Sequence, residues 1–222
     1  EKRAYADRAE FLGDTDFIDV PINNLISKKY AYDRFLTISP ELATPSSELN
    51  HGSINIQEES EETTHFSIVD KFGNAVSLTT TINSWFGNGI TVDNAGFLLN
   101  NEMDDFSIKP GFPNLYGLVG NKANSISPGK RMLSSMTPTI IENEQGDLFM
   151  VLGSPGGSTI ITTVVQILID TIDFNMPLKE AVETKRFHHQ WLPDKIQIER
   201  NSFSPALIET LEKMNHTIYK RS

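Results

Sequence analysis

The chain has 222 residues, and its contents of 38% hydrophobic and 22% charged residues are typical of a globular protein with a substantial core. Its formal net charge of -10, without a cluster of Lys or Arg, argues against a nucleic-acid partner, because neutralising phosphates requires a basic patch. Cysteine is absent, which excludes disulfides, thiolate metal sites and cysteine nucleophiles, and no apolar run is long enough to predict a membrane span.

The N-terminal part of the sequence predicts helices followed by an irregular segment. Alanine and charged residues dominate positions 1–10, and residues 20–35 contain a second short helix that starts at a proline. Residues 37–62 contain two prolines, several serines and the acidic run 57–62. We interpret this segment as an exposed tether of the kind that accepts cleavage.

A β-hairpin is expected directly after the tether. Residues 65–71 alternate in polarity, residues 72–74 carry a tight-turn signal, and residues 75–82 are rich in β-branched side chains. Because arms of roughly equal length flank the turn, the returning strand is expected to bring Thr81 close to Thr63.

Thr63, at the start of this hairpin, is the candidate nucleophile. A cut between Glu62 and Thr63 would give the threonine a free amine beside its own hydroxyl, so that one residue holds both nucleophile and base. The ordinary pKa of such an amine, about 7.7–8.0, suits proton transfer near neutral pH. The hydroxyl of Thr81 would orient the attacking oxygen. The plainer alternative is that Thr63 is simply a good strand former.

The sequence between the two halves is irregular. Residues 96–99 predict a short buried strand, and residues 100–120 contain several Pro and Gly residues. A loop of this length is too long for a plain connector, so we expect it to be a lid or a binding loop.

Two polar clusters in this region are candidates for binding a substrate. Residues 100–105, Asn-Asn-Glu-Met-Asp-Asp, are suited to an ammonium group with its three donors, to a metal ion, or simply to solvent. No histidine accompanies them, so the metal alternative is weak. Ser134 and Ser135 offer adjacent hydroxyls that would hold a carboxylate, or they form an ordinary polar loop.

The second half of the sequence alternates hairpin and helix signals. A second hairpin is predicted at residues 137–141 with 148–152. Helices are predicted at residues 159–174, 177–185 and 204–214, and short strands at residues 196–198 and 217–219. Strands that come in hairpins, with helices in blocks, indicate an α+β fold in which helices pack on antiparallel sheets.

A glycine-rich turn, residues 153–158, precedes the predicted helix at residues 159–174, which is apolar. Glycines let successive backbone N–H groups point into a site, and a helix N-terminus favours negative charge, so Gly156 and Gly157 are candidates for an oxyanion hole. The alternatives are a phosphate-binding loop or a plain turn. No Gly-Lys-Ser/Thr sequence follows, which argues against nucleotide binding.

Three histidines are interpreted as structural. His188 and His189 are adjacent, so their side chains point apart and make a poor metal site. His65 lies near Thr63 in the sequence, but the liberated amine already supplies the base.

The motifs together resemble one family, the γ-glutamyltranspeptidases (glutathione hydrolases), which are N-terminal nucleophile hydrolases. The resemblance covers essentially the whole chain. It rests on five segments in the same order, Thr63-Thr64-His65, residues 100–107, Leu133-Ser134-Ser135-Met136, residues 153–158 and residues 186–193. It implies an α+β fold of the N-terminal nucleophile hydrolase type, an αββα sandwich of which this chain holds a part.

The resemblance also implies two chains from one precursor, cut between Glu62 and Thr63. Residues 1–62 would be the C-terminal tail of the large subunit with its processing linker. Residues 63–222 would be the small catalytic subunit, truncated at its C-terminus, because the family's subunit continues further. An arginine of the large subunit that clamps the substrate carboxylate would lie upstream of residue 1.

Roles for single residues follow from the same resemblance. Thr63 is the implied nucleophile, Thr81 its hydrogen-bond partner, and Gly156 and Gly157 the oxyanion hole. Asn83, Glu102 and Asp105 are implied to hold the α-amino group of the substrate. Ser134 and Ser135 are implied to hold its α-carboxylate, and Tyr116 is implied to lie in the lid over the substrate.

The implied activity is the transfer of a γ-glutamyl group to an acceptor, or the hydrolysis of the γ-glutamyl bond. The substrates would be glutathione or other γ-glutamyl compounds, the acceptors amino acids, peptides or water, and the protein partner the large subunit of the same precursor. No metal or other cofactor is implied, and the expected location is the periplasm or outside the cell. The alternatives are a related acylase acting on glutaryl amides or poly-γ-glutamate, and an inactive fragment.

Overall fold

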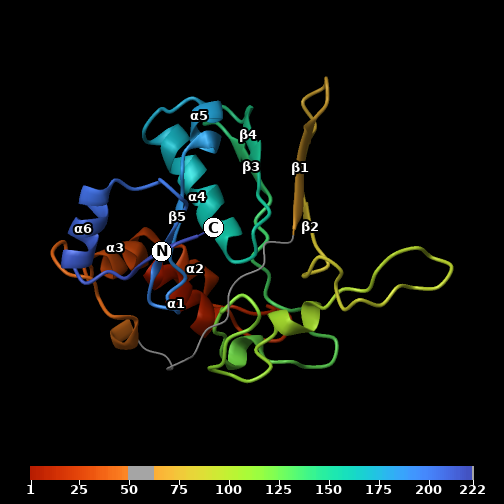
Figure 1. Ribbon diagram of the computed structural model, residues 1–222. Helices are drawn as coiled ribbons and strands as arrows, with labels where there is room; N and C mark the ends of the chain where they lie inside the picture. Colours follow the sequence, from red (N-terminus) through yellow and green to blue (C-terminus); the bar gives the residue numbers. More distant parts are fainter. Residues whose placement is uncertain (50–62, 222) are drawn as a thin grey trace. The chain divides into compact units, whose positions relative to one another are not determined.

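The computed structural model describes residues 1–49 and 63–221, which form two compact units (Figure 1). Unit 1 is assembled from three stretches of the chain, Glu1–Glu58, Asp104–Leu133 and Thr184–Ser222. Unit 2 is assembled from Glu59–Met103 and Ser134–Glu183. Unit 1 therefore combines segments from both sides of the predicted cleavage position. Unit 2 combines segments from both sides of residues 104–133.

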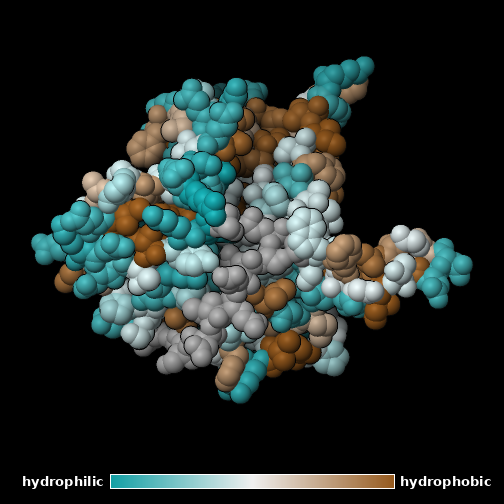
Figure 2. Space-filling view, viewed as in Figure 1, coloured by the Kyte–Doolittle hydropathy of each residue, from teal (hydrophilic) through white to brown (hydrophobic). Residues whose placement is uncertain are grey.

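Unit 2 begins with the expected hairpin. Strand β1, Thr64–Val69, pairs antiparallel with β2, Ala75–Thr80, in an unbroken register that runs from Thr64 opposite Thr80 to Val69 opposite Ala75. The side chain of Asp70 holds the turn, since its Oδ1 accepts hydrogen bonds from the N–H groups of residues 72 and 74. Apolar side chains of this hairpin, including Ile68 and Val76, are exposed. Brown, hydrophobic surface is visible in the upper part of Figure 2, where Figure 1 shows the hairpin.

A second hairpin in unit 2 carries the core. Strands β3, Thr139–Glu142, and β4, Leu148–Leu152, are antiparallel and pack against helices α4, Thr159–Ile172, and α5, Leu178–Glu183. The buried residues at this contact are Met150, Leu152, Val164, Ile167 and Ala181. Helix α4 has a continuous apolar face because its isoleucines and valines recur at helical spacing.

The two hairpins are joined by one side chain. Ser77 of β2 donates its hydroxyl hydrogen to the carbonyl of Leu152, at 2.9 Å, and accepts a hydrogen bond from the N–H of Thr139, at 3.1 Å. A single serine thus satisfies one backbone group on each strand of the second hairpin.

Unit 1 contains most of the helices. In chain order its helices and strands are α1 Lys2–Phe11, α2 Ile22–Leu25, α3 Lys28–Phe35, the 3-10 helices η1 Ser46–Leu49 and η3 Lys122–Asn124, β5 Phe187–His188, β6 Ile196–Ile198, α6 Pro205–Lys213 and β7 Ile218–Lys220. Strand β6 is the centre of a three-stranded sheet, antiparallel to β5 and parallel to β7. The core includes Tyr5, Ala9, Trp191 and Ile198.

The α+β prediction is confirmed, and both hairpins and the main helices form close to their expected positions. The buried strand predicted at residues 96–99 is wrong. Gly96 has φ +74°, the chain turns back there, and only an isolated bridge joins Thr91 to Leu98, while Phe97 and Leu99 are exposed. The parallel β6–β7 pair was also not expected, since the prediction was of antiparallel pairing. None of the helices in the described part of the chain combines the length and the apolar character of a membrane span.

Candidate active site

Thr63 and Thr81 lie at the same end of the first hairpin. The last paired residues there are Thr64 and Thr80, so Thr63 and Thr81 are the next residue on each chain. Both are half-buried. The hydroxyl oxygen of Thr81 accepts a hydrogen bond from the N–H of Asn83, at 2.9 Å, which fixes the position of that oxygen beside the hairpin end. Glu62, the residue before the predicted cut, lies outside the described residues.

Asn83 is held in an unusual backbone conformation. Its φ is +73°, which asparagine tolerates better than most residues, and its side chain is fully buried. The side-chain amide donates to the carbonyl of Asn101, at 3.2 Å. In turn Asn101 exchanges two hydrogen bonds with Ser84, through its Oδ1 and its Nδ2. These contacts tie Asn83 and Ser84 to Asn101, in the polar cluster of residues 100–105.

Glu102 therefore lies in unit 2, directly after the residue that Asn83 contacts. Its N–H donates to the side chain of Asn100, at 3.0 Å, and it opens the 3-10 helix η2, Glu102–Asp105. The side chain of Glu102 is half-buried. Asn83, predicted with Glu102 as a ligand of an amino group, thus bonds to the carbonyl of Asn101, the residue directly before Glu102.

The glycine loop leads from β4 into α4. Gly156 has φ +128° and Gly157 φ +52°, both in the left-handed half of conformational space that favours glycine. Their carbonyls accept the first hydrogen bonds of the helix, from the N–H groups of Thr159 and Ile160. A Cβ on Gly156 would lie 2.6 Å from the Thr159 hydroxyl. The N–H groups at a helix start have no intrahelical partner, which is the property that an oxyanion hole uses.

His65 is packed against this loop, a contact that sequence reasoning did not find. A Cβ built on Gly153 would lie 2.8 Å from Nε2 of His65 and still closer to Cε1 and Nδ1. The ring is held by the hydroxyls of Thr79, at 2.8 Å from Nδ1, and Ser67, at 3.0 Å from Nε2. Burial lowers the pKa of His65, which favours the neutral ring. The only sequence signal was a glycine at the end of a strand.

Ser134 and Ser135 belong to unit 2 and are half-buried. The hydroxyl oxygen of Ser134 accepts a hydrogen bond from the N–H of Met136, at 3.1 Å, so the chain turns locally around that side chain. This leaves the Ser134 hydroxyl hydrogen available to donate.

Two predicted binding residues, Asp105 and Tyr116, belong to unit 1. Asp105 accepts hydrogen bonds from two asparagine side chains, from Asn114 at its carboxylate and from Asn124 at its carbonyl. Tyr116 is buried, with 6% of its surface exposed, and its carbonyl accepts a hydrogen bond from Gln190 at 2.9 Å. The structure therefore divides the predicted site residues between the two units, with eight in unit 2.

Within residues 1–49 and 63–221, no three side chains of Asp, Glu or His lie together in a way that would hold a metal ion. The acidic residues of the 100–105 cluster are engaged elsewhere. The carboxylate of Asp104 accepts from the N–H of Leu115 at 2.6 Å, for example.

The family model described as Gamma-glutamyltranspeptidase matches residues 1–222. The chain belongs to the γ-glutamyltranspeptidase family. It is 52% identical over 212 residues to the glutathione hydrolase proenzyme of Escherichia coli K12, covering 96% of this chain and 36% of the relative. It is 47% identical over 221 residues to the corresponding proenzyme of Pseudomonas aeruginosa, covering 98% of this chain and 38% of the relative. The chain thus spans a little over a third of these curated relatives.

Solved structures agree with the membership in the γ-glutamyltranspeptidase family. A Helicobacter pylori γ-glutamyltranspeptidase is 55% identical, with a TM-score of 0.69 over 71% of this chain and 84% of that one. A cephalosporin acylase of Bacillus halodurans, at 23% identity, gives a TM-score of 0.80 over 100% of this chain and 37% of that chain, and this likeness shows the fold alone. The fold of the γ-glutamyltranspeptidase chain is that of the N-terminal nucleophile hydrolases.

Proposed function

We propose that the full-length protein transfers or hydrolyses γ-glutamyl groups through Thr63 as an N-terminal nucleophile. The observation that carries the proposal is the register of the first hairpin, which leaves Thr63 and Thr81 at the same end of that hairpin. The glycine loop, residues 153–158, belongs to the same compact unit. The names of the two curated relatives, both glutathione hydrolase proenzymes, support glutathione as the substrate.

The active form would arise by cleavage between Glu62 and Thr63. Residues 1–62 are then the tail of the large subunit with its linker, and residues 63–222 belong to the small subunit. Support comes from the proenzyme nature of the relatives, and from an acivicin-inhibited γ-glutamyltranspeptidase whose C-terminus has critical roles in autoprocessing and catalysis. Unit 1 combines residues from both sides of this bond, so the two products would remain packed together.

The chemistry proposed is acyl transfer through an ester. The Oγ atom of Thr63 attacks the γ-amide carbonyl, and its amine takes the hydroxyl proton and returns it to the departing amine. The N–H groups of Gly156 and Gly157 stabilise the oxyanion of the tetrahedral intermediate, a contribution of about 10²–10³ in rate for each donor. Water or the amine of an amino acid or peptide then attacks the ester, takes the γ-glutamyl group and frees the hydroxyl of Thr63.

Recognition of the γ-glutamyl head would use charge at both of its ends. Asn83, Glu102 and Asp105 would bind the α-amino group, and Ser134 and Ser135 would bind the α-carboxylate. An analogue that lacks the amino group would leave carboxylates unpaired, which is costly in a desolvated site. Tyr116 is proposed to cover the bound substrate.

The setting of the protein follows the family. We propose the large subunit of the same precursor as its protein partner, and the periplasm or the extracellular space as its location. The proposal needs no cofactor, since the threonine supplies both nucleophile and base.

The deciding experiment replaces Thr63 by Ala in the full-length protein and measures intact mass and γ-glutamyl anilide turnover. Both self-cleavage and turnover should disappear. A Thr63→Ala protein that still splits between residues 62 and 63 refutes the assignment. A panel that compares γ-glutamyl with glutaryl anilides separates this activity from that of a related acylase, because only the former substrate carries the amino group.

A further inference from the structure

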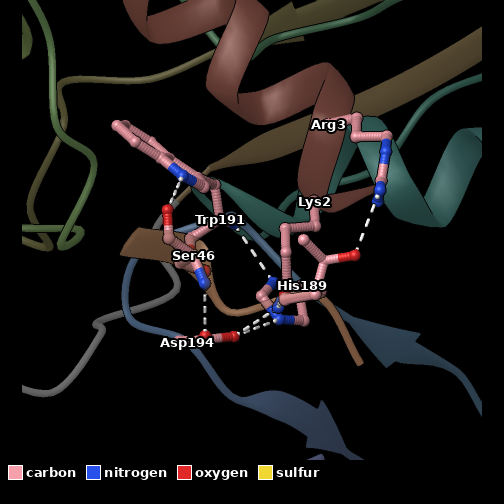
Figure 3. Close-up of polar contacts among 7 residues, drawn as sticks. Lys2, Arg3, Ser46, His189, Trp191 and Asp194 are labelled. Carbon is pink, nitrogen blue, oxygen red and sulfur yellow. Dashed lines mark hydrogen bonds and ion pairs between the residues drawn. The ribbon is translucent and has the colours of Figure 1, made fainter. Parts of the chain in front are cut away.

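A cluster of polar contacts in unit 1 joins residues near the beginning of the chain to residues 189–194 (Figure 3). Its members come from residues 1–49, which precede the proposed cleavage, and from residues 189–194, which follow it. We call these residues the Asp194 cluster, and they are Lys2, Ser46, His189, Trp191 and Asp194. None of them takes part in the chemistry proposed above.

Ser46 is the centre of the cluster on the N-terminal side, and only 1% of its surface is exposed. Its N–H donates to Oδ2 of Asp194, at 2.6 Å, and its hydroxyl donates to the carbonyl of Trp191, at 2.5 Å. Its own carbonyl accepts from the indole N–H of Trp191, at 3.1 Å. Every polar group of Ser46 is therefore hydrogen-bonded, and all of its partners belong to Trp191 or Asp194. We call these two residues the socket of Ser46.

Asp194 connects three donors from different parts of unit 1. Besides Ser46, it accepts from Nζ of Lys2, at 2.5 Å, and contacts Nε2 of His189, at 3.3 Å. Burial alone would raise the pKa of Asp194, but hydrogen bonds from His189, Lys2 and Ser46 together hold it well below its usual range. The carboxylate is therefore charged, and its contacts are charge-assisted.

His189 completes the socket in its neutral form. Burial lowers its pKa, although the contact with Asp194 opposes that shift. Its Nδ1 accepts a hydrogen bond from the N–H of Trp191, at 3.1 Å, so the ring proton is on Nε2 and points to Asp194. The histidine thus holds both socket residues in position.

The residues just before Ser46 are also held by contacts with other parts of unit 1. The carbonyl of Thr44 accepts from Nζ of Lys2, at 2.7 Å, and the N–H of Ala43 donates to the carbonyl of Met214, at 2.7 Å. Residues 43–46 therefore contact residues 191, 194 and 214, all of which belong to the small subunit if the chain is cut as proposed.

We propose that Trp191, Asp194 and Met214 form a docking surface for residues 43–46, and that it keeps this part of the large-subunit tail in place after cleavage. The inference rests on the proposed function for the cut itself. Before cleavage the tether holds the two partners at a high effective concentration, whereas afterwards that covalent link is gone. The contacts of Ser46 should therefore matter more in the cleaved protein than in the uncleaved one.

The test measures amide hydrogen exchange at residues 43–49 in the full-length protein. Asp194→Ala is compared with Asp19→Ala, a matched change at an exposed aspartate of unit 1. In the cleaved enzyme, Asp194→Ala should speed exchange of this segment at least tenfold, and Asp19→Ala should leave it unchanged. In the uncut Thr63→Ala background, the effect of Asp194→Ala should be smaller.

A second form of the protein keeps the test independent of self-cleavage. A site-specific protease sequence replaces residues 52–57 in the Thr63→Ala background, and the purified protein is then nicked. If wild-type protein never cuts itself, the proposed processing fails, but the nicked protein still tests the docking surface. The docking proposal is overturned if residues 43–49 exchange as fast as a free peptide in the cut protein, or if Asp194→Ala changes nothing there.

Discussion

The imidazole of His65 occupies the space that a side chain at Gly153 would need. His65 is the second residue of β1, two positions after Thr63, and Gly153 is the first residue of the loop that carries Gly156 and Gly157. The ring is anchored in the hairpin by Thr79. One contact therefore sets the spacing between the strand that follows the proposed nucleophile and the proposed oxyanion loop.

We expect Gly153→Ala to lower kcat by roughly 10- to 100-fold, because misplacing a catalytic group by about 1 Å can cost that much. The KM should change little, since the proposed substrate-binding residues are not in this loop. In a His65→Ala background the ring is gone, so the same Gly153→Ala change should cost much less. Steady-state kinetics on the four proteins of this cycle measure the coupling directly.

Gly146→Ala is the control for this cycle. Gly146 lies in the turn between β3 and β4 with φ +85°, and no atom lies within 4 Å of a Cβ built there. Its replacement strains the backbone whether or not His65 is present. If Gly153→Ala causes the same loss in both backgrounds, as Gly146→Ala should, then His65 does not position the loop.

Thr81 offers a second test of the site. Thr81→Val keeps the shape of the side chain but removes the oxygen that accepts from the N–H of Asn83. Because this hydroxyl is the proposed partner that orients Thr63, and misplacing a catalytic group by about 1 Å can cost about 100-fold in rate, we expect kcat to fall about 10- to 100-fold. Thr81→Ser retains the oxygen and should retain most of the activity. Equal losses in the two variants would contradict the role of the hydroxyl.

Local patterns in the sequence predicted the elements that local forces determine. The first hairpin could be predicted because the turn at residues 72–74 and the β-branched arm fix its register, and helix α4 because its apolar spacing is regular. The strand at residues 96–99 failed because Gly96 turns the chain before a second strand can pair. The Asp194 cluster could not be predicted, since nothing near Ser46 in the sequence indicates Trp191 as its partner.

The candidate site shows the same division. The motif residues could be named from the sequence, but their supports depend on contacts between distant segments. Asn101 holds Asn83, and His65 packs on Gly153, through hydrogen bonds and volumes that no periodicity encodes. The sequence also gave no indication that Asp105 and Tyr116 belong to a compact unit different from that of Thr63.

Ser77 is expected to contribute to stability through its two hydrogen bonds to the second hairpin. Ser77→Ala would leave the N–H of Thr139 and the carbonyl of Leu152 without this partner, at a cost of about 1–3 kcal/mol in the free energy of unfolding. Urea unfolding of the uncut Thr63→Ala protein measures the change. Thr80→Val, at an exposed position of the same strand, serves as the control and should shift the midpoint much less.

Acid should destabilise unit 1 through His188, which is almost fully buried and stacks edge-on against Tyr5. Burial lowers the pKa of His188 to about 4, whereas its value in the unfolded chain is near 6.5. Since the folded pKa is the lower one, the unfolded state binds the proton first. The full stability is present above about pH 6.5 and is lost as the pH falls toward 4.

At about 1.4 kcal/mol for each unit of pKa difference, His188 alone should remove roughly 3 kcal/mol from the free energy of unfolding at the acid end. Urea unfolding of the uncut protein between pH 7.5 and 4.5 measures this loss. His188→Gln cannot titrate, so its unfolding free energy should fall less steeply over that range. His216→Gln, at a half-buried histidine, is the matched control and should keep most of the wild-type slope. A His188→Gln protein with an unchanged slope would assign the acid sensitivity to other groups, of which His189 is the next most buried.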